Sequence, residues 1–165
     1  MTHALALRAT TIAAALFALA AGAHAAPLYH LIDLGPSTAP SGINKGNQVA
    51  GALAADEPAV FTKGAWQALR TPSGGAVTTG INATTSISGY LDRFPRTAVV
   101  WKPSGNLVKI ASVDPDDPHT GMTAYGVADD GEVVGTATAP SGVPFTMFAW
   151  AYHAGTVASL DVPAW

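Results

Sequence analysis

A ten-residue motif occurs three times in this chain and restricts its fold more than any other feature. The copies are GINKGNQVAG at 42–51, GINATTSISG at 80–89 and GVADDGEVVG at 126–135. Each copy begins with Gly and then Ile or Val, and ends with a second Gly two positions after an aliphatic residue. Self-similarity at about 40 residues is typical of repeat proteins, in which each unit buries its apolar face by stacking on its neighbours. The motif therefore predicts a stack of similar units.

The residues around the motif predict that each unit is built from short strands. Seventeen Gly and twelve Pro leave few windows in which a helix could form. Residues 48–53, 86–91 and 132–137 instead alternate as strands do, with a Gly at the same place in all three. A Gly inside a strand indicates that another backbone or side chain approaches closely. Aromatic residues recur in register with the repeat, which favours packing between units: Phe61, Trp101 and Trp150.

Polar turns precede these strands. Residues 44–47, 82–85 and 128–131 are rich in Asn, Asp, Gly and Thr, and each follows an apolar residue. Asn, Asp and Gly accept a positive φ or bond their own backbone, so each segment is predicted to close a hairpin. A second hairpin follows in every repeat. The first glycines of the motif are 38 and then 46 residues apart, and the extra length falls in residues 111–120.

We therefore expect an all-β fold of three tandem repeats, each with about four short antiparallel strands. The repeats span approximately residues 29–69, 70–110 and 111–162. Such units suit a β-propeller, but a closed propeller typically has four to eight blades. Three arrangements remain open: two chains forming a six-bladed ring, a monomer with pseudo-threefold symmetry such as a β-trefoil or β-prism, or an open array. A strand at 29–34 could pair with the last strand to close the monomer.

The N-terminus is predicted to be a secretory signal peptide, residues 1–25. A weakly basic start precedes an apolar stretch at 9–21, and Ala23 and Ala25 provide the small residues at a cleavage site. Residues 26–165 would then form a single domain. Arg8 is the one charged residue of the signal, so the remainder carries seven basic and eleven acidic residues, a formal charge of −4. This charge argues against a nucleic-acid surface. The absence of Cys means that disulfides do not stabilise the exported domain.

Several short segments resemble a known family. The segments 33–35 (Asp-Leu-Gly), 41–44 (Ser-Gly-Ile-Asn) and 48–51 (Gln-Val-Ala-Gly) are similar to units of the bacterial extracellular HAF-repeat proteins. The segment 125–135 is the closest copy. The family's His-Ala-Phe triplet does not occur, and 97–101 and 146–150 stand in its place. The resemblance implies propeller-type β-repeats and a secreted or periplasmic location in a bacterium, with no common activity.

The candidate chemistry lies in the insertion at 111–120. This segment places three carboxylates and an imidazole within six residues, at Asp114, Asp116, Asp117 and His119. Carboxylate oxygens at alternate positions can bind Ca²⁺, although the run lacks the Gly and the distal Glu of the helical calcium loop. Asp-Pro pairs also form ordinary turns. We identify no catalytic residue and no cofactor-binding motif, because there is no Gly-x-Ser-x-Gly elbow, phosphate loop or zinc spacing.

Two classes of function follow. The favoured one is an exported non-enzymatic β-repeat module that binds a glycan, a protein partner or its own copies, with a homodimer among the expected states. Exposed aromatic faces would suit sugar rings. The alternatives are a secreted hydrolase with its site in the loops, particularly 111–120, and a non-functional fragment of a longer repeat protein. No integral membrane segment is expected after cleavage of the signal.

Overall fold

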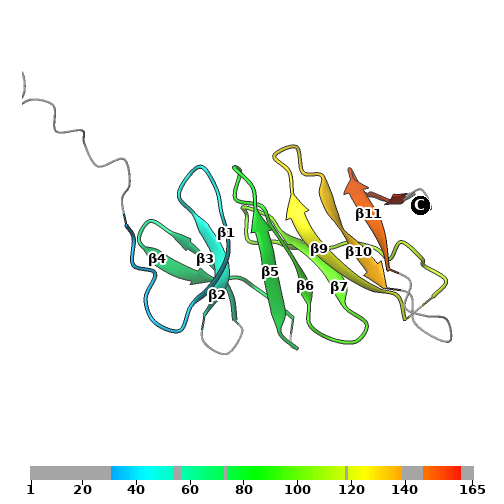
Figure 1. Ribbon diagram of the computed structural model, residues 1–165, viewed down its shortest axis with the longest axis horizontal. Coiled ribbons are helices and arrows are strands. Elements are labelled where there is room, and N and C mark those ends of the chain that lie inside the picture. The colour runs from blue at the N-terminus through cyan, green and yellow to red at the C-terminus, as the bar shows by residue number, and fades with distance from the viewer. Residues whose placement is uncertain (1–30, 54–56, 73, 118, 139–146, 161–165) are drawn as a thin grey trace, which may run out of the picture. The chain divides into compact units, whose positions relative to one another are not determined.

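The predicted hairpins form, and they build three four-stranded antiparallel sheets (Figure 1). The computed structural model describes residues 31–53, 57–72, 74–117, 119–138 and 147–160. Residues from Leu34 onward form one compact unit, and those up to Asp33 belong to another. The predicted signal peptide, residues 1–25, lies outside the described residues.

Each sheet takes its strands from one repeat, in sequence order. Sheet A contains β1 (Ala39–Ile43), β2 (Val49–Leu53), β3 (Glu57–Thr62) and β4 (Ala65–Ala68). Sheet B contains β5 (Ala76–Ile81), β6 (Ile87–Leu91), β7 (Thr97–Trp101) and β8 (Leu107–Lys109). Sheet C contains β9 (Gly121–Val127), β10 (Val133–Thr138), β11 (Met147–His153) and β12 (Thr156–Leu160). The all-β fold of three four-stranded repeats is thus confirmed.

The first turn of every sheet has one geometry. The N–H of its fourth residue donates to the carbonyl oxygen of its first: Asn47 to Asn44, Thr85 to Asn82, and Gly131 to Ala128. These fourth residues have φ of 56°, 67° and 91°. Asn and Gly accept a positive φ readily, whereas the β-branched Thr85 is an outlier there. The sequence predicted all three turn positions correctly, and in two of them Asn47 and Gly131 suit the positive φ of the fourth residue.

The last Gly of each motif lies under a tryptophan ring in every sheet. A Cβ placed on Gly51 would lie 3.1 Å from Trp66 Cη2, and one on Gly89 would lie 2.8 Å from Trp101 Cζ3. On Gly135 it would lie 2.8 Å from Trp150 Cε2. Backbone carbonyls of the neighbouring first strands also approach these positions. The predicted close approach is therefore confirmed.

Two apolar clusters join the sheets in a row. The A–B cluster includes Ala50 and Val60 from sheet A and Ile87, Leu91, Val99 and Trp101 from sheet B. The B–C cluster includes Ala98, Val100 and Ile110 from the sheet B repeat and Met122, Val133 and Trp150 from sheet C. Trp101 and Trp150 are both 0% exposed, so they pack in the core and offer no face to a sugar. Sheet B thus uses one face for sheet A and the other for sheet C.

Two details differ from the expectations. Residues 31–34 are not in a strand, so the described part of 29–34 provides no partner for the last strand. β12 pairs with β11 inside its own sheet. None of the three sheets closes into a barrel, as a β-trefoil would require. The reason is that each repeat pairs its four strands internally and meets the next repeat through faces rather than through strand edges.

Candidate functional sites

The acidic insertion forms local turns rather than a converging site. Asp114 Oδ1 accepts a hydrogen bond from the N–H of Asp116, and Asp117 Oδ1 accepts one from the N–H of His119. The Ser112 hydroxyl donates to the carbonyl of Asp114. Within the described residues, no group of three His, Asp or Glu side chains lies close enough to hold a metal ion. Two of the three candidate carboxylates therefore cap the backbone of their own loop.

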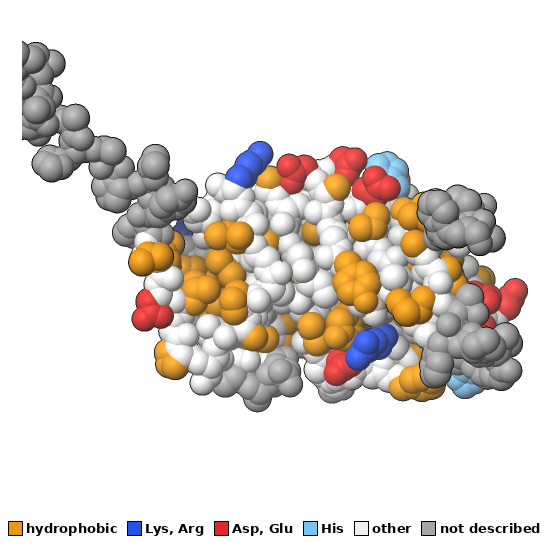
Figure 2. Space-filling model, in the orientation of Figure 1, with side chains coloured by type: hydrophobic (Ala, Val, Ile, Leu, Met, Phe, Trp, Pro, Cys, Tyr) orange, Lys and Arg blue, Asp and Glu red, His pale blue; other side chains and the backbone are white. Residues whose placement is uncertain are grey.

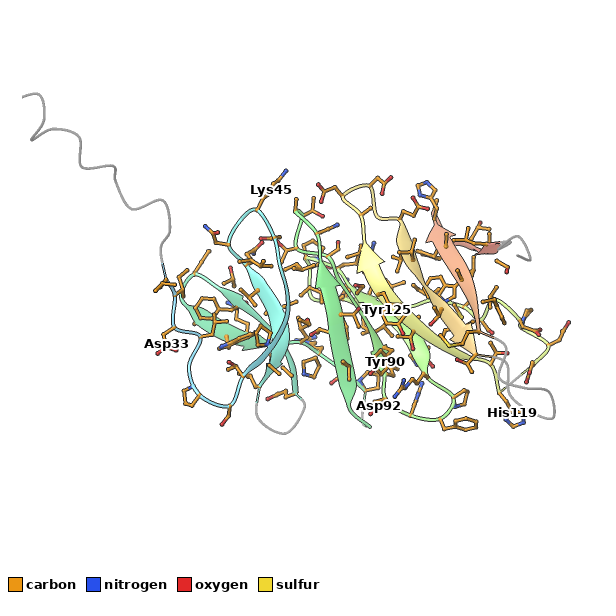
Figure 3. The ribbon with its side chains drawn as sticks, in the orientation of Figure 1. Asp33, Lys45, Tyr90, Asp92, His119 and Tyr125 are labelled. Atoms are coloured by element: carbon orange, nitrogen blue, oxygen red, sulfur yellow. The ribbon has the colours of Figure 1, made fainter. Side chains whose placement is uncertain are left out.

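His119 lies against an aromatic residue of the sheet B repeat. Its ring centroid is 6.4 Å from that of Phe94, which is 82% exposed. Nearby, Arg96 lies over the ring of Tyr90 at 4.6 Å and pairs with Asp92 at 3.3 Å. Figure 3 shows Tyr90 and Asp92 close together near the end of β6. These residues provide an aromatic surface and one ion pair, but no nucleophile lies beside a base among them.

Hollows lie at the joints between sheets, and two of them have charged side chains in their linings. One of about 310 Å³ is bordered by Arg70, Lys102 and Asn106 between sheets A and B, and its lining includes no carboxylate or imidazole. One of about 190 Å³ is bordered by Arg96, Asp117 and Thr120 beside the insertion. A hydrolytic triad needs a nucleophile, a base and an acid in mutual contact. Neither lining supplies that set.

The joints between sheets repeat one another in backbone detail. β1 lies against β5, and β5 lies against β9. At the first joint, a Cβ on Gly42 would lie 3.4 Å from Gly80 Cα and 3.5 Å from Ile81 Cγ2. At the second, a Cβ on Gly80 would lie 3.2 Å from the carbonyl oxygen of Tyr125. The first Gly of the motif thus lets one first strand approach the next.

Side-chain hydrogen bonds repeat across the joints as well. Asn44 Nδ2 donates to the carbonyl of Asn82 at 2.8 Å, and Asn82 Nδ2 donates to the carbonyl of Ala128 at the same distance. We call this series the Asn ladder. The third copy of the motif has Ala128 where the first two have Asn, so the ladder ends at sheet C.

A second series involves the residue that directly precedes the first Gly of each motif, Ser41 or Thr79. The Ser41 hydroxyl bonds Thr78 Oγ1 at 2.9 Å, and the Thr79 hydroxyl donates to the carbonyl of Ala124 at 2.8 Å. The equivalent residue of sheet C is Tyr125, which is 54% exposed. Figure 3 shows Tyr125 on β9. Sequence reasoning missed both series, although their donors recur in register with the motif.

The face of sheet C that points away from sheet B, here called the outer C face, is uncharged. Its residues follow from the register of β9 to β12, because they alternate with those of the B–C cluster. Val134, Met147 and Leu160 are 44%, 63% and 44% exposed. Cross-strand pairing places them in one surface with these neighbours: Gly126, Thr136, Thr138, Ala149, Ala151 and Ala158. None of these nine residues is Asp, Glu, Lys or Arg, and the same register adds Gly121, Thr123, His153 and Thr156 to this face.

At the other end of the row, sheet A turns its glycine-and-tryptophan face away from sheet B; we call this the outer A face. It contains Gly51 with Trp66 above it, and Phe61 in edge-to-face contact with Trp66 at 5.6 Å. The Trp66 indole N–H donates to the carbonyl of Leu34, as that of Trp101 donates to the carbonyl of Arg70. Ile43 of this face is 67% exposed, whereas its counterparts Ile81 and Val127 pack against the two clusters.

Charged side chains lie mainly at the ends of the strands in the view of Figure 2, and apolar and uncharged side chains occupy the middle.

No family model, no curated protein and no solved structure matches this chain. Among the described residues, no helix is long and apolar enough to cross a membrane. The joints and the outer faces are the candidate binding features of the described residues.

Proposed function

We propose that this chain is an exported, non-enzymatic β-repeat module that self-associates through the outer C face. The predicted signal peptide and the resemblance to extracellular HAF-repeat proteins support export. Neither of the two hollows described above brings a nucleophile, a base and an acid together, which favours a binding role over catalysis. A module that instead bound a glycan or another protein, as the sequence also allows, would stay monomeric on its own.

The observation that carries this proposal is the uncharged outer C face. A face of a repeat unit that is exposed to water is expected to be polar. The outer C face instead has three large apolar side chains among Gly, Ala and Thr. Contiguous apolar surface of this kind marks an interaction site. Sheets A and B use the corresponding faces to hold the next sheet.

The test is the mass of the exported protein in solution across a range of concentrations. We expect an assembly of two or more copies, which Thr136→Lys and Val134→Lys convert to monomer, because each places an ammonium group inside the contact. Ser104→Lys is the matched control, since Ser104 lies in the exposed turn before β8 and should leave the mass unchanged. A wild-type monomer at all concentrations would contradict the proposal.

The hydrolase alternative has a separate test. Replacing Asp116, Asp117 and His119 together with Asn, Asn and Gln should preserve folding and self-association, because Asp117 caps its own loop and the His119 ring lies against the exposed Phe94. The measurements are thermal unfolding, solution mass and release of product from a panel of ester, peptide and glycoside substrates. A hydrolytic activity that the wild type has and the triple variant lacks would establish an enzyme instead.

A further inference from the structure

In the two joints inside this chain, the preceding sheet and the following sheet contribute different residues. In each, the preceding sheet contributes the first Gly of its motif and the donors of the Asn ladder. The following sheet contributes the apolar residue after its own Gly, Ile81 or Val127, together with its glycine-and-tryptophan face. Two different faces therefore meet at every joint.

Within the described residues, the two halves of one further joint have no partner sheet. Gly126 is the preceding half, since a Cβ placed there would meet nothing closer than its own sheet's Val134 Cγ2 at 3.7 Å. Its φ does not lie in the left-handed region, so neither conformation nor contact inside the chain requires Gly at this position. Ile43 is the following half: it lies on the edge strand β1 and is 67% exposed, whereas Val49, Ala59 and Phe61 of the same face are already buried.

We propose that self-association is head-to-tail: the outer C face of one copy receives the outer A face of a second copy, with Ile43 of the second against Gly126 of the first. The occupant is a second copy because the chain itself contains both complementary halves and already joins them twice. This inference rests on the proposed function. Two copies joined at both ends would form a ring of six sheets, within the four to eight units of closed β-propellers.

The ladder atoms indicate that this joint is weaker than the internal ones. The carbonyls of Asn82 and Ala128 each accept two hydrogen bonds, one inside the turn and one from the Asn of the preceding sheet. The carbonyl of Asn44 accepts the turn bond from Asn47 and keeps a lone pair for a second donor. Ala128 of the other copy has no side-chain donor to supply it. The inferred joint therefore forms reversibly, with apolar contact as its main contribution.

The test uses engineered cysteines, because the chain has none of its own. Ile43→Cys and Gly126→Cys proteins are prepared separately, mixed, oxidised and examined by non-reducing electrophoresis. We expect a covalent dimer from the mixture and at least tenfold less from either variant alone. The double variant Gly42→Cys with Ile81→Cys is the positive control, because this pair already meets at the A–B joint and should form an internal disulfide.

Other results separate the two proposals. A cross-link in either variant alone would show that like faces meet, which overturns the head-to-tail joint and leaves self-association intact. An assembly that gives no mixed disulfide also overturns it. A protein that remains monomeric in solution contradicts the proposed function itself. Both substitutions should fold, since Ile43 is exposed and Gly126 has room for a Cβ.

Discussion

Single residues carry most of the information that this chain gives about its packing. Gly51, Gly89 and Gly135 are required because an indole ring and a backbone carbonyl occupy the space of a side chain. The sequence could predict the close approach, since the three Gly recur in strands. It could not identify Trp66 as the covering residue of sheet A. That indole comes from β4, whereas Trp101 lies on β7 and Trp150 on β11, both third strands.

Gly89→Ala tests the close approach. Its methyl group would overlap Trp101 Cζ3 and the carbonyl oxygen of Val77, so we expect a loss of about 2–4 kcal/mol in the free energy of unfolding. Gly121→Ala is the matched control, because the nearest atom there is 3.5 Å away and φ is ordinary. It should be neutral or stabilising by up to about 1 kcal/mol. Equal effects in chemical denaturation would contradict the packing.

A second residue-scale prediction concerns the two buried indoles. The Trp101 N–H donates to the carbonyl of Arg70, whereas the Trp150 N–H is buried without a hydrogen-bond partner among the described residues. Phe at either position leaves a similar cavity, but only Trp101→Phe also breaks a hydrogen bond. We expect Trp101→Phe to lose about 1 kcal/mol more than Trp150→Phe in urea denaturation. An equal or smaller loss for Trp101→Phe would show that this bond contributes nothing net.

At the scale of elements, the first hairpin turn both closes its strands and joins its sheet to the next. Asn82 is 5% exposed, and its Oδ1 accepts from the N–H groups of Thr84 and Ser86 while its Nδ2 donates across the joint to Ala128. The turn function was predictable because Asn suits such turns. The joint function was not, since a donor's partner in another repeat depends on how the sheets face each other.

Asn82→Asp separates these two functions. The Asp keeps the acceptor for the turn but replaces the donor with a carboxylate oxygen facing the carbonyl of Ala128. We expect a loss of about 2–4 kcal/mol at pH 7, because like partial charges meet in a buried site. Protonation gives the carboxyl an O–H that can donate, so the loss relative to wild type should shrink as pH falls toward 3. A pH-independent difference in urea denaturation would contradict the ladder.

For the whole molecule, the repeat period was enough to predict three four-stranded units, and their internal strand pairing confirmed it. How the three units stack on one another could not be predicted, because the repeat period says nothing about the rotation between neighbouring sheets. For the same reason the candidate site moved from the acidic insertion to the outer C face. The acidic residues at 114–117 stood out by composition, yet Asp114 and Asp117 cap local turns. The outer C face became visible only when the strand register placed Val134, Ala151 and Ala158 side by side.

Ala128 sets the strength of the inferred assembly, which gives a gain-of-function prediction. In Ala128→Asn the new Nδ2 would donate to the carbonyl of Asn44 in a second copy, as Asn82 does to Ala128 within the chain. One such bond contributes about 0.5–1.5 kcal/mol, so we expect the dissociation constant to fall by about 2- to 13-fold for each joint formed, measured by sedimentation equilibrium.

Ala128→Asp is the control, because it supplies the same acceptor to the turn without the donor. An effect that came only from a better turn would appear in both variants, whereas a completed ladder tightens the Asn variant alone. If both variants tighten equally, or neither does, Ala128 does not face the second copy's Asn44 and the head-to-tail register is wrong.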